Sequence, residues 1–199
     1  MKKSGAFSKA RRQFHAALLK SVLSADASGV PANADRHSQG SVKIAQNIRE
    51  QIGKSAKEAE RLAGQESGAK FEGLVCDFIS ATFTRLPHLR PGDWQIERVA
   101  GAGGIHIAKF DQYSHLIALQ KAAEKDRELA AALGSDYTIT PDIIVARNPE
   151  PDEMINHDVQ LVDDDVSVLT PLRKVNQGLP ILHASISCKW TIRSDRAQN

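Results

Sequence analysis

The stretch YTITPDIIVA, residues 137–146, decides the fold, because β-branched and other apolar side chains run through it almost without interruption. A short continuous apolar run of this kind predicts a buried strand. Pro141 falls near the middle of the run, and a proline is tolerated there only at a sheet edge or at a bulge. Such irregular positions often turn a side chain toward a site, and Asp142 is the next residue.

Two further segments have the pattern of strands. Residues 181–190 alternate an apolar set with the polar set His183, Ser185, Ser187 and Lys189, which predicts a strand with one polar face. Residues 94–99 (WQIERV) are short and partly apolar, and the glycines at 101, 103 and 104 close them with a turn. We therefore expect at least three strands, with Asp142 and Lys189 each near the end of its own.

The rest of the chain reads as helices and one long connection. Apolar side chains at helical spacing predict helices over residues 9–24, around Ile44 to Ile52, and over 71–82, with Glu72 just off the apolar stripe of the last. Residues 111–133 predict one long helix that ends at Gly134. Residues 148–180 show no period and predict a surface connection. This order of elements predicts the α/β class.

Length and composition bound the class of protein. The chain has 199 residues and is 41% hydrophobic, which suits a single domain over 1–199. Cys76 and Cys188 are far apart and belong to no Cys or His cluster, so a zinc site is unsupported and a reducing cytoplasm is expected. No segment reaches the run of about 18 apolar residues that a membrane span needs, so we expect no membrane partner.

The charges are segregated along the chain although their sum is only +2. Residues 1–72 carry 13 basic and 7 acidic side chains, residues 150–172 carry 7 acidic and no basic ones, and residues 173–199 carry 5 basic and 1 acidic. Two basic ends suit the binding of a polyanion, because phosphate neutralisation depends on the local density of Lys and Arg. Ordinary charged helix surfaces are the alternative explanation.

Asp142, Lys189 and Glu72 could form one catalytic constellation if their segments converge. A carboxylate is a hard ligand suited to Mg²⁺, which can activate a water beside a phosphodiester. A lysine can hold that water or neutralise the charge that develops on the phosphate. Glu72 is the candidate for the second carboxylate. Taken one at a time, each of these residues is more simply explained as structural or solvated.

A resemblance to a known family strengthens that constellation. It is carried by SGAKFEGLVCDFI (67–79), LPHLRPGDW (86–94), AALGSDYTITPDIIVARN (131–148) and LHASISCKWTIRSDRAQN (182–199). These segments resemble the NgoMIV family of type II restriction endonucleases in the PD-(D/E)xK nuclease superfamily. Pro141-Asp142 and Ser187-Cys188-Lys189 match the family's PD and SCK motifs. The resemblance implies a restriction-endonuclease-like core, a central mixed β-sheet flanked by helices.

The resemblance also implies roles. Asp142 and the backbone carbonyl of Cys188 would be metal ligands, Lys189 the catalytic lysine and Glu72 the upstream acid. Ser187 stands where most of the superfamily has a carboxylate, and this family recruits a glutamate from the following helix instead. That glutamate would fall beyond Asn199. We therefore expect a fold that is incomplete at its C-terminus, and a 199-residue chain that cleaves DNA poorly by itself.

Base recognition is expected just after the lysine. Arg193 and Arg196 lie on one face of a predicted helix start, and guanidinium groups pair bidentately with guanine in the major groove. Asp195 could accept from a cytosine amine. The resemblance implies that this Arg-Ser-Asp-Arg string reads the inner part of GCCGGC, with Gln65 and Asp35 near the positions that read the outer pair. Ion pairs with the acidic residues 150–172 are the alternative for the arginines.

Together these features predict an Mg²⁺-dependent type II restriction endonuclease that cleaves double-stranded DNA at a GC-only palindrome. A palindromic target implies a homodimer, the resemblance implies a homotetramer, and a restriction system implies a cognate DNA methyltransferase. Two alternatives stay open. One is a repair or recombination nuclease of the same superfamily, and the other is a catalytically incomplete remnant or DNA-binding module of the same fold.

Overall fold

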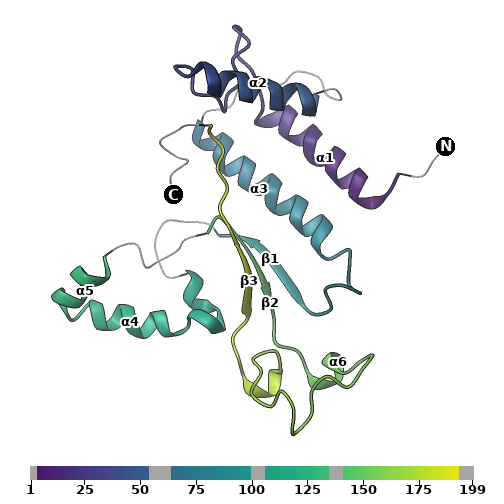
Figure 1. Cartoon of the computed structure of the whole chain (residues 1–199), viewed down its shortest axis with the longest axis vertical. Coiled ribbons are helices and arrows are strands. Elements are labelled where there is room, and N and C mark those ends of the chain that lie inside the picture. Colours follow the sequence, from purple (N-terminus) through teal and green to yellow (C-terminus); the bar gives the residue numbers. More distant parts are fainter. Residues whose placement is uncertain (1–3, 54–63, 100–105, 135–140, 193–199) are drawn as a thin grey trace. The chain divides into compact units, whose positions relative to one another are not determined.

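A computed structural model describes residues 4–53, 64–99, 106–134 and 141–192 (Figure 1). The chain divides into two compact units, which are described separately. Unit 1 comprises Met1–Arg85 and Cys188–Asn199, and unit 2 comprises Leu86–Ser187. The prediction of a single domain over 1–199 stays a prediction.

Unit 2 is built on a sheet of three strands in the order β1, β2, β3, namely Trp94–Arg98, Ile143–Arg147 and Ile181–Ile186. Both pairs are antiparallel, and the register places Arg98 and Ile186 on either side of Ile143. Residues Ile143 to Ala146 of β2 are at most 2% exposed, as a strand covered on both faces should be. The α/β class and the presence of three strands are confirmed, although the described strands pair only in the antiparallel sense. The predicted end of the third strand is wrong, since β3 ends at Ile186 and leaves Lys189 outside the strand.

The predicted position of Pro141 within the strand is wrong. Pro141 is buried but precedes β2, which begins at Ile143, and residues 135–140 of the predicted strand lie outside the described residues. β2 is the central strand and bonds to neighbours on both sides, so it could not accommodate a residue that lacks an N–H. The backbone pairing nevertheless extends back to Asp142, directly after the proline.

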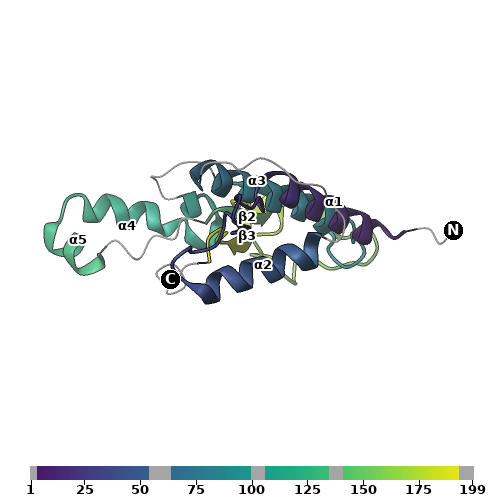
Figure 2. The ribbon, with the colours of Figure 1, turned by 90° about the horizontal axis from the view of Figure 1, so that it is seen from above.

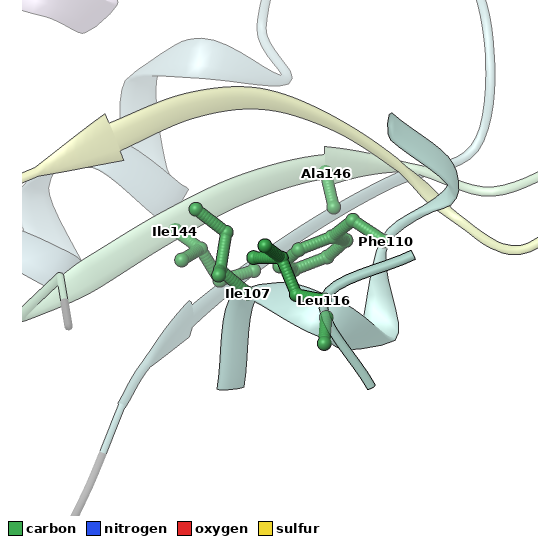
Figure 3. Packing of buried hydrophobic residues seen from close by; sticks show 6 residues of the cluster. Ile107, Phe110, Leu116, Ile144 and Ala146 are labelled. Carbon is green, nitrogen blue, oxygen red and sulfur yellow. The ribbon is translucent and has the colours of Figure 1, made fainter. Parts of the chain in front are cut away.

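The core of unit 2 lies against the sheet. Ile107 and Phe110, from the turns around His106–Lys109 and Asp111–Tyr113, pack with Leu116 of α4 (His115–Ala123) against Ile144 and Ala146 of β2 (Figure 3). Phe110 is 1% exposed. This apolar contact is the main hydrophobic stabilisation of the sheet.

The predicted single helix over residues 111–133 is wrong, because the chain breaks there into a short 3-10 turn, α4 and α5 (Arg127–Leu133). Asp126 has an extended backbone, and its side chain accepts hydrogen bonds from the N–H groups of Glu128 and Leu129. That is the geometry of a helix N-cap, so Asp126 starts a new helix where composition alone predicts a continuous one. Gly134 ends α5 with a φ of 64°, as expected.

Unit 1 contains α1 (Ala6–Ser21), α2 (Gln39–Gly53) and α3 (Gly64–Phe83), and in two views α1 runs beside α3 (Figures 1 and 2). All three predicted helices are therefore confirmed, each with boundaries shifted by a few residues. The buried cluster is Leu18, Leu19, Val22 and Leu23 at the end of α1. Two ring pairs join elements within the unit: Phe14 with Phe78 at 4.9 Å between centroids, and Phe71 with Trp190 at 5.4 Å.

Residues 148–180 form the predicted surface connection, with the short helix α6 (Asp152–Ile155) and one 3-10 turn inside it. Its anchor is Arg173, whose buried guanidinium lies 2.5 Å from the carboxylate of Asp152. The hydrogen bond from Arg173 lowers the pKa of Asp152. Among the described residues, no helix is both long enough and apolar enough to cross a bilayer.

Candidate active site

Asp142 and Ser187 meet at one end of the sheet in unit 2. The Asp142 N–H donates to the Ile186 carbonyl at 3.0 Å, and the Val99 N–H donates to the Asp142 carbonyl at 2.9 Å. The described pairing of β2 with β3 ends at Ile143 and Ile186, so Asp142 and Ser187 are the residues that adjoin it on the two strands. The Ser187 hydroxyl lies 3.5 Å from Asp142 Oδ2, at the long limit of a hydrogen bond.

This arrangement presents a half-buried carboxylate on a backbone that hydrogen bonds hold from both sides. The donor set of one carboxylate and nearby backbone carbonyls suits Mg²⁺, which commonly takes one or two protein carboxylates and keeps several waters. Among the described residues, no group of three or more His, Cys, Asp or Glu side chains could hold a metal by itself. Asp142 is thus the described carboxylate here that could contribute one ligand to a divalent cation.

Glu72 and Lys189 belong to unit 1. Glu72 lies on α3 and is half-buried, whereas Lys189 is exposed. Each is the chain neighbour of one member of the Phe71–Trp190 ring pair, so that contact brings the backbones of Glu72 and Lys189 into the same neighbourhood. Cys188 is half-buried between Ser187 and Lys189, which are both exposed, and this continues the alternation predicted for residues 181–190.

Of the predicted base-reading residues, Asp35 is the one whose side chain is described. It lies in the turn before α2, and its Oδ1 accepts a hydrogen bond from the His37 N–H at 3.0 Å. Gln65 is on α3, but its side chain lies outside the described residues. Arg193, Asp195 and Arg196 also lie outside them. Their base-reading roles remain predictions.

The turn of Asp35 touches the segment that leads into Arg193. Ala34 forms a parallel bridge with Ile192, and the Ile192 N–H donates to the Asn33 carbonyl at 2.9 Å. This contact joins residues more than 150 positions apart in the sequence, and nothing in the local pattern predicts it. It places the turn of Asp35 next to Ile192, the last described residue before Arg193.

A loop with a strongly perturbed carboxylate precedes this turn. Asp26 accepts hydrogen bonds from the Ser28 side chain at 2.6 Å and from the Val30 N–H at 3.0 Å, and Arg36 lies 2.5 Å from its other oxygen. These contacts, with the Ser28 hydroxyl as the largest cause, lower the pKa of Asp26 to about 2. The carboxylate is thus ionised at neutral pH and fixes the shape of the loop.

Two residues of this region were missed by the sequence reasoning. Asn33 supplies the carbonyl that accepts from Ile192, and Ser41 donates its hydroxyl to the Ile192 carbonyl at 2.6 Å. The available signal was the Ser-Gln-Gly-Ser string at 38–41, which is typical of a helix start and does indeed begin α2. It says nothing about a partner in residue 192.

Comparison with known proteins gives two findings. The model of the family described as NgoMIV restriction enzyme matches residues 14–199. The chain is also similar to the type II restriction enzyme NgoMIV of Neisseria gonorrhoeae, with 50% identity over 194 residues, or 97% of this chain and 68% of that enzyme. The matched region contains both Asp142 and the Ser187–Lys189 segment.

Proposed function

Because the chain belongs to the NgoMIV restriction enzyme family, a family of type II site-specific deoxyribonucleases, we propose that it hydrolyses double-stranded DNA at GCCGGC with Mg²⁺. The observation that carries this proposal is the pairing of Asp142 with Ser187 at the end of two adjacent strands. That pairing joins the two short motifs on which the resemblance depends, although more than 40 residues separate them in the chain.

Asp142 and the Cys188 carbonyl are the residues proposed to hold the metal. When bound, Mg²⁺ supplies charge neutralisation at the phosphate and lowers the pKa of a coordinated water. The carboxylate of Asp142 is suited to this task because its backbone is fixed by hydrogen bonds to Val99 and Ile186. Ser187 supports the carboxylate from the opposite strand.

Lys189 is proposed to neutralise the charge that develops on the phosphate. Glu72 is proposed to orient the water shell of the metal. Lys189 follows Ser187 by two residues, so their Cα atoms are within about 7 Å of each other whatever the backbone conformation. In an extended backbone, its side chain would lie on the same side as that of Ser187. The contact between Phe71 and Trp190 supports a common location for Glu72 and Lys189.

Recognition of the target is proposed to come from two segments of unit 1. Arg193, Asp195 and Arg196 would read the inner base pairs, and Asp35 with Gln65 would read the outer ones. The support is the contact of Ala34 with Ile192, which makes the Asp35 turn the neighbour of the chain entering Arg193. A carboxylate that accepts from cytosine N4 and arginines that donate to guanine suit a target of G·C pairs.

We also propose a homo-oligomer, dimeric or tetrameric, because a two-fold symmetric target is read by two copies. Residues 150–180 support this, since they expose large apolar side chains: Leu161 is 59% exposed, Leu169 87% and Val175 67%. Large apolar side chains that lie exposed in one segment are surface that a second copy could cover. A cell that contains such an enzyme needs a methyltransferase to protect its own sites, so a cognate methyltransferase and a cytoplasmic location belong to the proposal.

The test uses the purified chain and two plasmids, one with a single GCCGGC site and one with the same bases in scrambled order. Each is incubated with Mg²⁺ or with a chelator, and binding to the corresponding short duplexes is measured in parallel. We expect a preference of at least about thirtyfold for the GCCGGC duplex, which is the low end of what two bidentate contacts supply. Metal-dependent cutting, which is expected to be slow, should occur only at that site.

Each outcome has a defined meaning. Cutting at GCCGGC that stops with the chelator supports the proposed function. Specific binding without cutting favours the DNA-binding module of the same fold and removes the catalytic part of the proposal. Equal binding to both duplexes, without cutting, overturns the proposal altogether.

A further inference from the structure

One buried serine links the turn of Asp35 to the backbone of Ile192. The hydroxyl of Ser41 accepts a hydrogen bond from the Asp35 N–H at 2.9 Å and donates one to the Ile192 carbonyl at 2.6 Å. Ser41 itself is 7% exposed. A single oxygen is therefore shared between two backbone segments that come from opposite ends of the chain.

The serine is held in place by the start of α2. Its own N–H lies 3.3 Å from the Ser38 hydroxyl, as in a helix N-cap, and the Ser38 N–H donates to the Asp35 carbonyl at 3.1 Å. The His37 N–H fixes the Asp35 carboxylate in the same turn. The position of the Asp35 side chain thus follows from that of Ser41, because both belong to one hydrogen-bonded turn.

The backbone of Ile192 is hydrogen-bonded to the same segment that contains Asp35. Ile192 donates its N–H to the Asn33 carbonyl and accepts at its own carbonyl from Ser41, so both of its backbone polar groups are bonded to residues 33–41. Ile192 is the last residue before Arg193. The junction therefore fixes the backbone of the last described residue before the Arg-Ser-Asp-Arg string.

The two segments that Ser41 joins also contain buried polar atoms without partners. Within the described part of the chain, Asn33 Oδ1 and Thr191 Oγ1 are buried side-chain atoms that have no hydrogen-bond partner. Buried polar atoms without partners are costly, so the junction already contains unfavourable contacts. Loss of the shared hydroxyl would leave two more backbone groups unsatisfied.

We propose that Ser41 is a positioning residue for specificity, which ties the turn of the outer base-pair reader Asp35 to Ile192, the residue directly before the inner base-pair reader Arg193. This inference rests on the proposed function, because the two residues act as readers only if the chain binds GCCGGC. Its distinctive consequence is that one substitution, remote from any base, relaxes discrimination at the outer and the inner positions together. Substitution of either reader relaxes discrimination mainly at its own position.

The test measures competition binding, without Mg²⁺, to GCCGGC and to duplexes altered at the outer pair (ACCGGT) or at the inner pair (GCATGC). We expect Ser41→Ala to lower both discrimination ratios by about three- to tenfold, the size of one lost hydrogen bond. Ser41→Cys, which keeps a similar volume and a weak donor, should lie between it and the wild type. If Ser41→Ala does not fold, the two discrimination ratios are measured on Ser41→Cys instead.

The matched control is Ser21→Ala. Ser21 is also buried, 8% exposed, and its hydroxyl donates at 2.7 Å to the Ala17 carbonyl within its own helix. Ser21→Ala removes one serine hydrogen bond but does not disconnect two segments of the chain, so both discrimination ratios should stay unchanged. A uniform loss of affinity for all three duplexes in Ser41→Ala, or the loss of only one ratio, would overturn the inference.

A second measurement separates this inference from the proposed function. Amide hydrogen exchange should show that the Asp35 and Ile192 N–H groups are protected in the wild type and exchange at least about threefold faster in Ser41→Ala. If the wild type prefers none of the duplexes, the proposed function fails. The amide exchange rates then test by themselves whether Ser41 couples the Asp35 turn to Ile192. Unchanged protection of both amides in Ser41→Ala would then overturn the coupling as well.

Discussion

In unit 2, four consecutive residues of β2 are at most 2% exposed, whereas on α3 of unit 1 Ser67 is the buried residue among those whose side chains are described. The buried polar residues show the reverse distribution. Ser21, Ser24, Asn33, Ser41 and Ser67 all lie in unit 1, and Arg173 lies in unit 2. Unit 2 thus keeps its shape mainly by apolar burial, and unit 1 depends more on specific polar contacts.

This difference matches the chemistry proposed for each unit. Asp142 needs a rigid backbone to present a metal ligand, and a strand buried on both faces provides one. The Asp35 turn must match a series of base edges, and hydrogen bonds fix its direction in a way that apolar packing does not. Five predictions test this contrast, from the largest expected effect to the smallest.

Phe110→Ala should destabilise the protein by about 3–5 kcal/mol, because it removes the 1% exposed ring that packs against β2. Denaturant unfolding measures the change. Leu169→Ala is the control, since Leu169 is 87% exposed and its loss should change stability by less than about 0.5 kcal/mol. A loss below about 1 kcal/mol for Phe110→Ala would contradict the view that apolar burial maintains the sheet.

Asp142→Asn should lower the rate of Mg²⁺-dependent plasmid cleavage at least about a hundredfold, because a neutral amide binds the cation poorly. DNA binding should be kept or strengthened, since one negative charge near the phosphates is removed. The control is Asp93→Asn, a carboxylate at the other end of the β1–β2 pair that accepts from Asn148 Nδ2 at 2.9 Å. Retained cleavage in Asp142→Asn would remove this residue from the mechanism.

Arg193→Ala should cost about 1–3 kcal/mol of discrimination against duplexes with an altered inner pair, the contribution of one bidentate contact to guanine. The measurement is the ratio of dissociation constants for GCCGGC and GCATGC. Measurements of cleavage and of binding thus distinguish the roles of the two units. Asp142 should affect the rate of cleavage, whereas Arg193 should affect which DNA sequence is bound. An equal loss on every duplex would instead make Arg193 a phosphate contact.

Phe78→Leu should destabilise the protein by about 0.5–1.5 kcal/mol, because it removes the stacked pair with Phe14 while it keeps an apolar side chain. The rings are 4.9 Å apart, and both side chains are half-buried. Denaturant unfolding beside Phe110→Ala gives the comparison directly. A loss as large as that of Phe110→Ala would show that the two units depend equally on apolar burial.

Asp26→Asn should change the acid dependence of stability. The pKa of Asp26 falls from 3.8 to about 2 on folding, so its stabilisation is complete above about pH 4 and is lost as the pH falls through about 2. The variant should therefore unfold at lower urea concentration than the wild type at pH 6, and the two midpoints should converge toward pH 2. A constant difference across that range would contradict the assignment.

Local pattern was sufficient for much of the fold. Apolar side chains at helical spacing identified α1, α2 and α3, and alternation identified β3, because these periods follow from the geometry of a single element. The break at Asp126 was missed, since capping depends on where the backbone leaves the helix rather than on composition. The position of Pro141 was misjudged because the sequence does not reveal that β2 has a neighbour on each side.

The candidate site divides in the same way. The sequence by itself determined which residues are proposed to carry the chemistry, since the motifs at Asp142 and Lys189 are short strings of particular residue types. Only the tertiary structure decided that the Ser187 hydroxyl lies 3.5 Å from the Asp142 carboxylate and that Ser41 joins the Asp35 turn to Ile192. The physical reason is that residue type and spacing act along the chain, whereas strand register and shared hydrogen bonds arise from packing between segments that are remote along it.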